Sequence, residues 1–169
     1  MKILLHGATN FGSSNFGDYI YADVIYQYIK KAYPYCSVQF YQPSQYFKNN
    51  IKGYYECGIK PWNADLILYI PGGYFGECHN ARFRDNVIHF LRFMPVGLLG
   101  VLFRKKIAVI GIGAGPIKSP LLKIPISIIG KKAKVISVRD HESYVALEQL
   151  GLSNVVESSD MIISMDFKS

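Results

Sequence analysis

Three glycine-rich segments, each directly after an apolar run, are the residues of this chain whose type and spacing could bind an anionic ligand. They span residues 6–18 (HGATNFGSSNFGD), 71–77 (PGGYFGE) and 111–116 (GIGAGP). Glycine lets the backbone approach a ligand without interference from a Cβ atom. A loop that leads into a helix also presents free N–H groups at the positive end of the helix dipole. Such segments suit a phosphate or a carboxylate.

A further apolar run, over residues 134–138, ends in Arg139 and Asp140. If these runs are neighbouring parallel strands, their carboxyl ends share one edge of the sheet, which is where such folds bind ligands. Each feature alone has a simpler interpretation. The glycine pair of the second segment can simply form a tight turn, and Asp18 can simply serve as a helix cap. Arg139 and Asp140 can form a surface ion pair that contributes roughly 0–1 kcal/mol to stability. Their coincidence at one predicted edge favours a binding site.

The glycine-rich segments match neither of the common nucleotide motifs. A Walker A loop would end in Gly-Lys-Ser/Thr, whereas Gly17-Asp18 ends the first segment. The dinucleotide pattern G-x-G-x-x-G fails in the first segment because Thr9 replaces a glycine, and it fails in the third because Pro116-Ile117 follows. A nucleotide cofactor is therefore a weak interpretation, and no cofactor is expected.

Other catalytic and metal-binding patterns are also absent from the sequence. The four histidines lack the i, i+4 spacing of metal ligands, and no Ser-His-Asp or Cys-His arrangement can be argued. Glu77 and Glu142 could act as an acid or a base, but the sequence assigns neither role. The catalytic residues stay unassigned, and no metal is expected.

An alternation of apolar runs with helical patterns predicts the elements that position these residues. Strands are expected over residues 2–7, 37–42, 64–73, 106–116 and 134–140, with one or two short strands over 155–165. Helices are expected over 18–33, 80–93, 121–133 and 141–151, and a loop with one short helix over 43–63. This order predicts a single Rossmann-like α/β domain over residues 1–169, with a parallel sheet and helices on both faces.

The first predicted helix shows the kind of detail that the pattern supports. Ile20, Val24 and Tyr28 recur at helical spacing and are expected to face the core. Asp18 can cap the start of this helix, and Pro34 ends it.

Composition places the chain among globular proteins with one core. Half of the 169 residues are apolar, and the thirteen tyrosines are interpreted as packing residues, with sugar stacking as the alternative. The net charge is +7, but no base-reading motif accompanies the scattered basic residues. An anionic small substrate or an acidic membrane surface is therefore favoured over nucleic acid. Three cysteines without a C-x-x-C motif argue against disulfides and zinc, and favour a reducing cytoplasm.

The most apolar window, residues 93–103, is about half of the roughly 20 residues that a membrane-spanning helix needs. Pro95 and Gly97 interrupt it, and Arg104, Lys105 and Lys106 follow it. The window is interpreted as a buried helix with a basic end. The alternative is a helix that rests on the cytoplasmic face of a membrane.

Taken in order, the motifs resemble the polysaccharide pyruvyl transferase family. Residues 15–18 (NFGD) are similar to the N-x-G-D that precedes the first helix in that family, and residues 64–77 to its apolar strand that enters a glycine pair. Residues 111–116 match its G-x-G-x-GP turn. Residues 138–143 match a V-R-D-x-x-S segment before a helix that ends in Leu-Gly, and residues 158–160 loosely match an S/T-x-D element.

The resemblance implies transfer of a pyruvyl group from phosphoenolpyruvate to a sugar of a cell-envelope polysaccharide or exopolysaccharide. It also implies a fold like one half of a GT-B-type, two-domain glycosyltransferase. Arg139 would bind the phosphate or the carboxylate of the donor, and backbone N–H groups near the glycines would hold charge as phosphate departs. The substrate-binding residues implied in this way are Asn10, Gly12, Asn15, Gly17, Asp18, Gly72, Gly73, Gly113, Gly115, Arg139 and Asp140.

The chain also departs from the family pattern. Members are usually about twice as long, and their second half would supply further basic donor contacts and a catalytic histidine. Tyr19 stands where an acidic residue often follows the aspartate of N-x-G-D. The chain is therefore expected to be an N-terminal half that needs a second catalytic domain, or a homo-oligomer. The alternatives are a half-domain that binds a nucleotide sugar, and a non-catalytic domain that docks a partner through residues 93–103.

Overall fold

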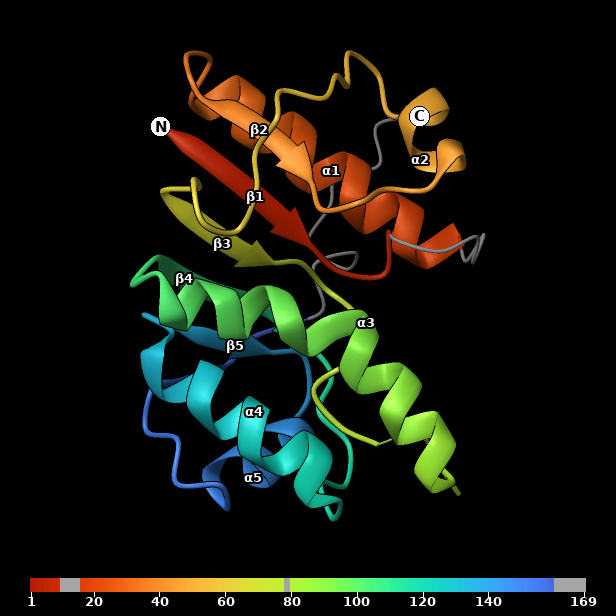
Figure 1. Ribbon diagram of the computed structural model, residues 1–169, viewed down its shortest axis with the longest axis vertical. Helices are drawn as coiled ribbons and strands as arrows, with labels where there is room; N and C mark the ends of the chain where they lie inside the picture. The colour runs from red at the N-terminus through yellow and green to blue at the C-terminus, as the bar shows by residue number, and fades with distance from the viewer. Residues whose placement is uncertain (10–15, 78–79, 160–169) are drawn as a thin grey trace.

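The computed structural model describes residues 1–9, 16–77 and 80–159 (Figure 1). Its strands are β1 (Lys2–His6), β2 (Ser37–Phe40), β3 (Leu66–Tyr69), β4 (Lys106–Ile112), β5 (Ile136–Val138) and β6 (Val155–Glu157). Its helices are α1 (Phe16–Ala32), α2 (Gln45–Asn50), α3 (Phe83–Leu102), α4 (Pro120–Lys132) and α5 (His141–Glu148). The predicted alternation of strands and helices is confirmed.

The strands form one parallel sheet in the order β2-β1-β3-β4-β5-β6. This arrangement confirms the predicted Rossmann-like α/β class. From β1 the chain first adds β2 on one side and later β3 on the other, so the order reverses between β1 and β3. A doubly wound sheet binds ligands beyond the carboxyl ends of its strands, near such a reversal.

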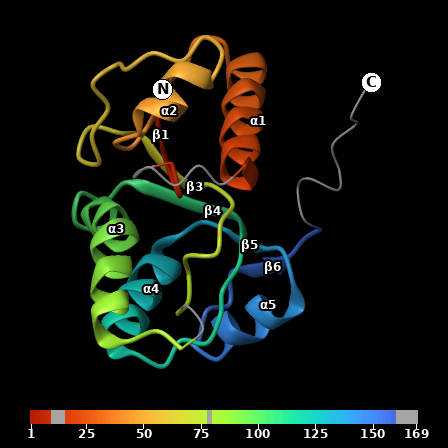
Figure 2. The same cartoon turned by 90° about the vertical axis from the view of Figure 1, so that its right-hand side faces the viewer.

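Two buried clusters lie on the two faces of the sheet. Leu4, Ile67 and Val109 belong to the cluster that includes side chains of α3, α4 and α5. The alternate strand positions, such as Leu5 and Leu68, belong to the cluster that includes α1. Figure 2 shows α3 and α4 on one side of the sheet and α1 on the other. The predicted placement of helices on both faces is thereby confirmed.

Helix α1 differs from its prediction in start and in phase. It begins at Phe16, so Asp18 lies in the first turn and does not cap the helix. The buried residues are Tyr21, Ala22, Ile25, Tyr26 and Ile29, whereas Tyr28 is 70% exposed. The prediction that Tyr28 faces the core was wrong. The buried side of α1 is displaced by one residue along the sequence from the predicted side, and one residue corresponds to a rotation of about 100° around the helix axis.

Helix α3 includes most of the apolar window and is longer than predicted. By length and composition it could cross a membrane, the one helix of the described residues that could. Its inner side nevertheless packs closely within the protein. A Cβ atom on Gly97 would overlap Tyr69 and Ile129, and one on Gly100 would lie 2.6 Å from Cδ1 of Ile67. Residues 93, 94, 96, 97 and 100 are buried, as the buried-helix interpretation expects.

Candidate functional site

The turns after β3 and β4 remain joined beyond the ends of the two strands. Gly72 forms a parallel bridge with Ile112, and the Gly113 N–H donates to the Gly72 carbonyl at 3.0 Å. The Phe75 N–H then donates to the Gly113 carbonyl at 3.4 Å. The second and third glycine-rich segments therefore form one continuous wall at the carboxyl edge of the sheet.

This wall depends on a very close approach of two backbones. A Cβ atom on Gly76 would overlap the backbone N of Gly115, and one on Gly115 would lie 3.2 Å from the Glu77 carbonyl oxygen. A backbone neighbour cannot move aside as a flexible side chain can. Glycine is therefore required here for close packing of the two turns, which is a structural role.

Arg139 follows β5 and lies directly over the end of β4. Its backbone N–H donates to the Ile112 carbonyl at 3.1 Å. Its guanidinium covers Gly113 so closely that a Cβ atom there would lie 2.9 Å from Nη2. The Arg139 Nε is 3.4 Å from Oδ2 of Asp140, and 39% of the Arg139 side chain is exposed. The guanidinium is thus held at the wall with its outer part open to solvent.

Asp140 orients this arginine and also caps α5. Its Oδ1 accepts a hydrogen bond from the Ser143 N–H at 2.8 Å. Partial desolvation raises the pKa of Asp140, but the hydrogen bonds from Ser143 and the charge of Arg139 outweigh it and lower the pKa overall. Asp140 is therefore ionised near neutral pH, and its geometry is that of a cap and an ion-pair partner.

Ser143 connects α5 to the turn after β4. Its buried hydroxyl accepts a hydrogen bond from the Ala114 N–H at 2.7 Å. The Asp-x-x-Ser spacing thus places both the cap of α5 and the anchor of the β4 turn within one helical turn. Ser143 is a site residue that the predicted set omitted, although the capping pattern in the sequence could have indicated it.

These residues surround a cavity of about 260 Å³, called here the Arg139 cavity. Three carboxylates line it together with the single arginine, so the cavity itself does not carry an excess of positive charge. Its lining residues are Gly73, Glu77, Gly113, Ala114, Gly115, Arg139, Asp140, Glu142 and Ser143.

Glu77 has a structural partner that was not expected from sequence. Its carboxylate accepts hydrogen bonds from the backbone N–H groups of Lys118 and Ser119, just before α4. Glu77 therefore anchors the segment that leads into α4 from the opposite turn. Since the N–H groups of Gly113 and Ala114 are also bonded within the protein, fewer N–H groups face a ligand than the glycine content suggested.

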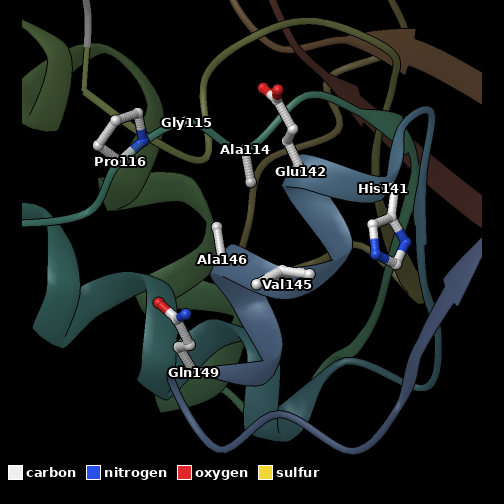
Figure 3. Close-up of a pocket in the computed structure, with 8 residues that line it drawn as sticks. All are labelled: Ala114, Gly115, Pro116, His141, Glu142, Val145, Ala146 and Gln149. Carbon is white, nitrogen blue, oxygen red and sulfur yellow. The ribbon is translucent and has the colours of Figure 1, made fainter.

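A second, larger hollow of about 370 Å³ adjoins the Arg139 cavity and shares three lining residues with it: Ala114, Gly115 and Glu142. Figure 3 shows Ala114, Gly115 and Pro116 along one side of this hollow and α5 along the other. Val145 and Ala146 make its α5 side largely apolar, with His141 and Gln149 toward the two ends. The hollow is an extension into which a bulkier ligand could reach.

A group of buried polar side chains lies where the strand order reverses. His6, the last residue of β1, is fully buried, and its Nε2 is 3.1 Å from the Phe93 carbonyl oxygen. Burial lowers its pKa from 6.5 to about 4. Nδ1 of His6 and Oγ1 of Thr9 have no hydrogen-bond partner within the part of the chain that the structure describes. His6 is thus a neutral, buried imidazole near neutral pH.

Asp18, His89 and Arg92 belong to the same region. Burial raises the pKa of Asp18 and lowers that of Arg92, and the charge of each opposes the shift of the other. His89 Nε2 is 2.8 Å from the Tyr74 carbonyl oxygen, and burial lowers the pKa of its imidazole. His6, His89 and Arg92 were not among the predicted site residues, because no local spacing relates them.

The predicted site residues fall into three groups. Gly73, Gly113, Gly115, Arg139 and Asp140 line the Arg139 cavity, and Gly72 is buried beneath it. Gly17 and Asp18 lie at the start of α1 and do not line that cavity. Asn10, Gly12 and Asn15 lie outside the described residues.

Among the described residues, no group of His, Cys, Asp and Glu side chains is arranged to hold a metal ion.

The sequence matches one family of known proteins. A family model described as polysaccharide pyruvyl transferase matches residues 15–168, which is most of the chain. No curated protein and no solved structure matches it.

Proposed function

The chain belongs to the polysaccharide pyruvyl transferase family, and from this premise we propose that the Arg139 cavity binds phosphoenolpyruvate as a pyruvyl donor. The observation that carries the proposal is the placement of Arg139. Its guanidinium packs against Gly113 and lies beside the Asp140 carboxylate, with its outer part open to the cavity. A fixed guanidinium pairs with a carboxylate or phosphate through two parallel hydrogen bonds.

The carboxylates of the cavity favour one orientation of the donor. Asp140 is engaged as the cap of α5 and Glu77 bonds the backbone just before α4, whereas Glu142 lies at the exposed rim. Repulsion by Glu142 disfavours a doubly charged phosphate beside it. We therefore place the donor carboxylate on Arg139 and direct its phosphate toward the reversal of strand order, where Arg92 lies.

The proposed reaction balances as follows. Two hydroxyl oxygens of the acceptor sugar form bonds to C2 of phosphoenolpyruvate, and the bond between C2 and the phosphate oxygen breaks. One hydroxyl proton ends on C3, which becomes a methyl group, and the other leaves with inorganic phosphate. The product is a pyruvyl ketal of the sugar, in a cell-envelope polysaccharide or exopolysaccharide.

Turnover is proposed to need a second domain or chain that closes over the Arg139 cavity. Of the three carboxylates among the described residues that line this cavity, Asp140 caps α5, Glu77 bonds the backbone just before α4, and Glu142 is on the rim. We therefore assign none of them to deliver a proton to C3. A second half of a GT-B-type fold would supply such a group.

The two described cysteines are both free, which agrees with a reducing, cytoplasmic setting.

Calorimetry with phosphoenolpyruvate tests the binding step. Arg139→Ala should weaken donor binding by roughly 10- to 100-fold, since it removes a charge-assisted bidentate pair. Arg139→Lys should recover only part of the affinity. Arg104→Ala, an exposed arginine at the opposite edge of the sheet, is the matched control and should bind as the parent does.

Phosphate release with an acceptor glycan, measured with and without a candidate partner protein, tests the reaction itself. Absence of both phosphoenolpyruvate binding and turnover would contradict the proposal. Thermal stabilisation by a UDP- or GDP-sugar but not by phosphoenolpyruvate would instead support a nucleotide-sugar domain. Association with a partner protein without binding of either ligand would support a non-catalytic interaction domain.

A further inference from the structure

The edge of the sheet opposite the Arg139 cavity collects much of the positive charge of the chain. In a parallel sheet the strands start at this edge and the preceding helices end there, to the left in Figure 1. Nine of the 19 lysine and arginine residues lie in these strand starts, in these helix ends or in the turns between them: Lys2, Lys30, Lys31, Arg104, Lys105, Lys106, Lys131, Lys132 and Lys134.

The ends of helices explain part of this charge but not all of it. A cation in the last turn stabilises a helix because it opposes the negative end of the dipole. Lys30 and Lys31 in α1, and Lys131 and Lys132 in α4, are so placed. The run of residues 104–106 follows the end of α3 and continues into β4, beyond the last turn of the helix. The charge therefore exceeds what helix capping requires.

Exposed apolar side chains lie at the same edge. Leu102 and Phe103, at the end of α3, are 71% and 46% exposed. Trp62, in the turn before β3, is 52% exposed, and Tyr35, in the turn before β2, is 98% exposed. Large exposed aromatic side chains beside lysine and arginine are the composition of proteins that rest in a lipid headgroup layer.

The basic run of residues 104–106 is adjacent in space to the start of the chain and to the residues just before β3. Met1, the residues just before β3 and the turn from α3 to β4 together line a hollow of about 430 Å³. Its lining residues are Met1, Ala64, Asp65, Arg104, Lys105 and Lys106. Asp65, its one carboxylate, accepts a hydrogen bond from the Lys2 backbone N–H at 2.7 Å.

We propose that this amino-edge surface, made of the nine basic residues with Trp62, Leu102 and Phe103, docks on the headgroup layer of an anionic phospholipid bilayer. Each lysine or arginine near such a layer contributes about a fivefold gain in partitioning, and the apolar side chains enter the interface. The bilayer lies along the amino edge, so α3 keeps its contacts with α4 and the sheet. The Arg139 cavity, at the opposite edge, then faces away from the bilayer and stays open.

Co-sedimentation with vesicles tests the proposal. The chain should bind vesicles of phosphatidylcholine with phosphatidylglycerol, and bind poorly to phosphatidylcholine alone. Trp62 is the only tryptophan of the chain, so its fluorescence should shift to shorter wavelength on the anionic vesicles. High salt should weaken binding, because the screening length falls from about 8 Å at physiological ionic strength to about 3 Å at 1 M salt.

Two double variants with the same change of net charge locate the surface. Lys131→Glu with Lys132→Glu should weaken binding to the anionic vesicles by about tenfold or more. Lys52→Glu with Lys123→Glu, at exposed lysines outside the amino-edge surface, should bind nearly as the parent does. Circular dichroism should show both variants folded, and Trp62→Ala should separately reduce binding without changing the net charge.

Several results would overturn the proposal. These are absence of binding to anionic vesicles, equal loss in the two double variants, and an unshifted Trp62 emission. Tighter binding to single-stranded nucleic acid than to vesicles, lost in the same variants, would assign the surface to nucleic acid. None of these measurements depends on phosphoenolpyruvate, so this proposal and the proposed function can fail separately.

Discussion

The two edges of the sheet are built by opposite means from the same strands. At the carboxyl edge, the turns after β3, β4 and β5 are joined by backbone hydrogen bonds, and glycines allow them to touch. At the amino edge, the turns carry long, exposed lysine and arginine side chains beside exposed aromatic rings. One edge is closely packed and the other is open and charged.

The comparison shows that net charge and the candidate site are separate properties of this chain. The net charge of +7 suggests an anion-binding site. The Arg139 cavity nevertheless contains one arginine and three carboxylates, while basic residues gather at the far edge. Selectivity for an anionic donor at the cavity would come from the position of one guanidinium, whereas attraction to an extended anionic surface would come from the amino edge.

The largest effect is expected where the two glycine turns meet. Gly76→Ala should lower the free energy of unfolding by about 3 kcal/mol, because its Cβ atom would overlap the backbone of Gly115. Gly73→Ala is the matched control, since a Cβ atom there meets nothing within 4 Å, and it should change stability by less than about 0.5 kcal/mol. Urea unfolding measures both. Equal stability of the two variants would contradict the close packing of this edge.

Acid should weaken the carboxyl edge through His6. The folded pKa of His6 is lowered from 6.5 to about 4, so between these values the unfolded chain binds a proton that the folded chain excludes. Stability should therefore be full above pH 6.5 and should fall as the pH falls toward 4, by on the order of 3 kcal/mol. Urea unfolding across this range measures the loss.

Two histidine variants identify the source of that acid loss. His6→Phe should show a smaller fall in stability from neutral to acid pH than the parent does. His141→Gln, at a histidine whose side chain is 73% exposed, should keep the parent's fall. The assignment to His6 would be wrong if His6→Phe kept it too.

A smaller effect is expected at the joint between α5 and the β4 turn. Ser143→Ala removes the acceptor of the buried Ala114 N–H, and an unsatisfied buried donor costs about 1–3 kcal/mol. Ser153→Ala, at an exposed serine, is the control and should be nearly neutral. Thermal unfolding of both variants, with hydrogen exchange of the Ala114 amide, tests the contact. Unchanged protection of that amide in Ser143→Ala would argue against it.

The smallest effect is expected at the amino edge. Lys31→Glu, in the last turn of α1, should cost about 0.3–1 kcal/mol through the helix dipole, and salt should remove most of the difference. Unfolding in low and high salt measures it. A loss as large as that of Gly76→Ala would mean that this edge also carries the stability of the fold, which would break the contrast between the edges.

Much of the local structure could be predicted from the sequence. Continuous apolar runs and helical spacing identified the strands and helices, because hydrophobic periodicity is a property of a few consecutive residues. The motifs from residues 15–18 to 158–160 also indicated the family that the comparison confirmed. The capping of α5 by Asp140 is equally local, because Asp140 accepts its hydrogen bond from the N–H group of Ser143, only three residues away.

Tertiary structure alone decided how these elements meet. The reversal of order between β1 and β3, the bonds from the backbone before α4 to Glu77, and the burial of His6 each join residues tens of positions apart. Even the buried side of α1 depended on the sheet, as Tyr28 shows. Local backbone preferences extend over only a few residues, whereas strand order, long-range caps and the gathering of charge at one edge depend on which distant surfaces pack together.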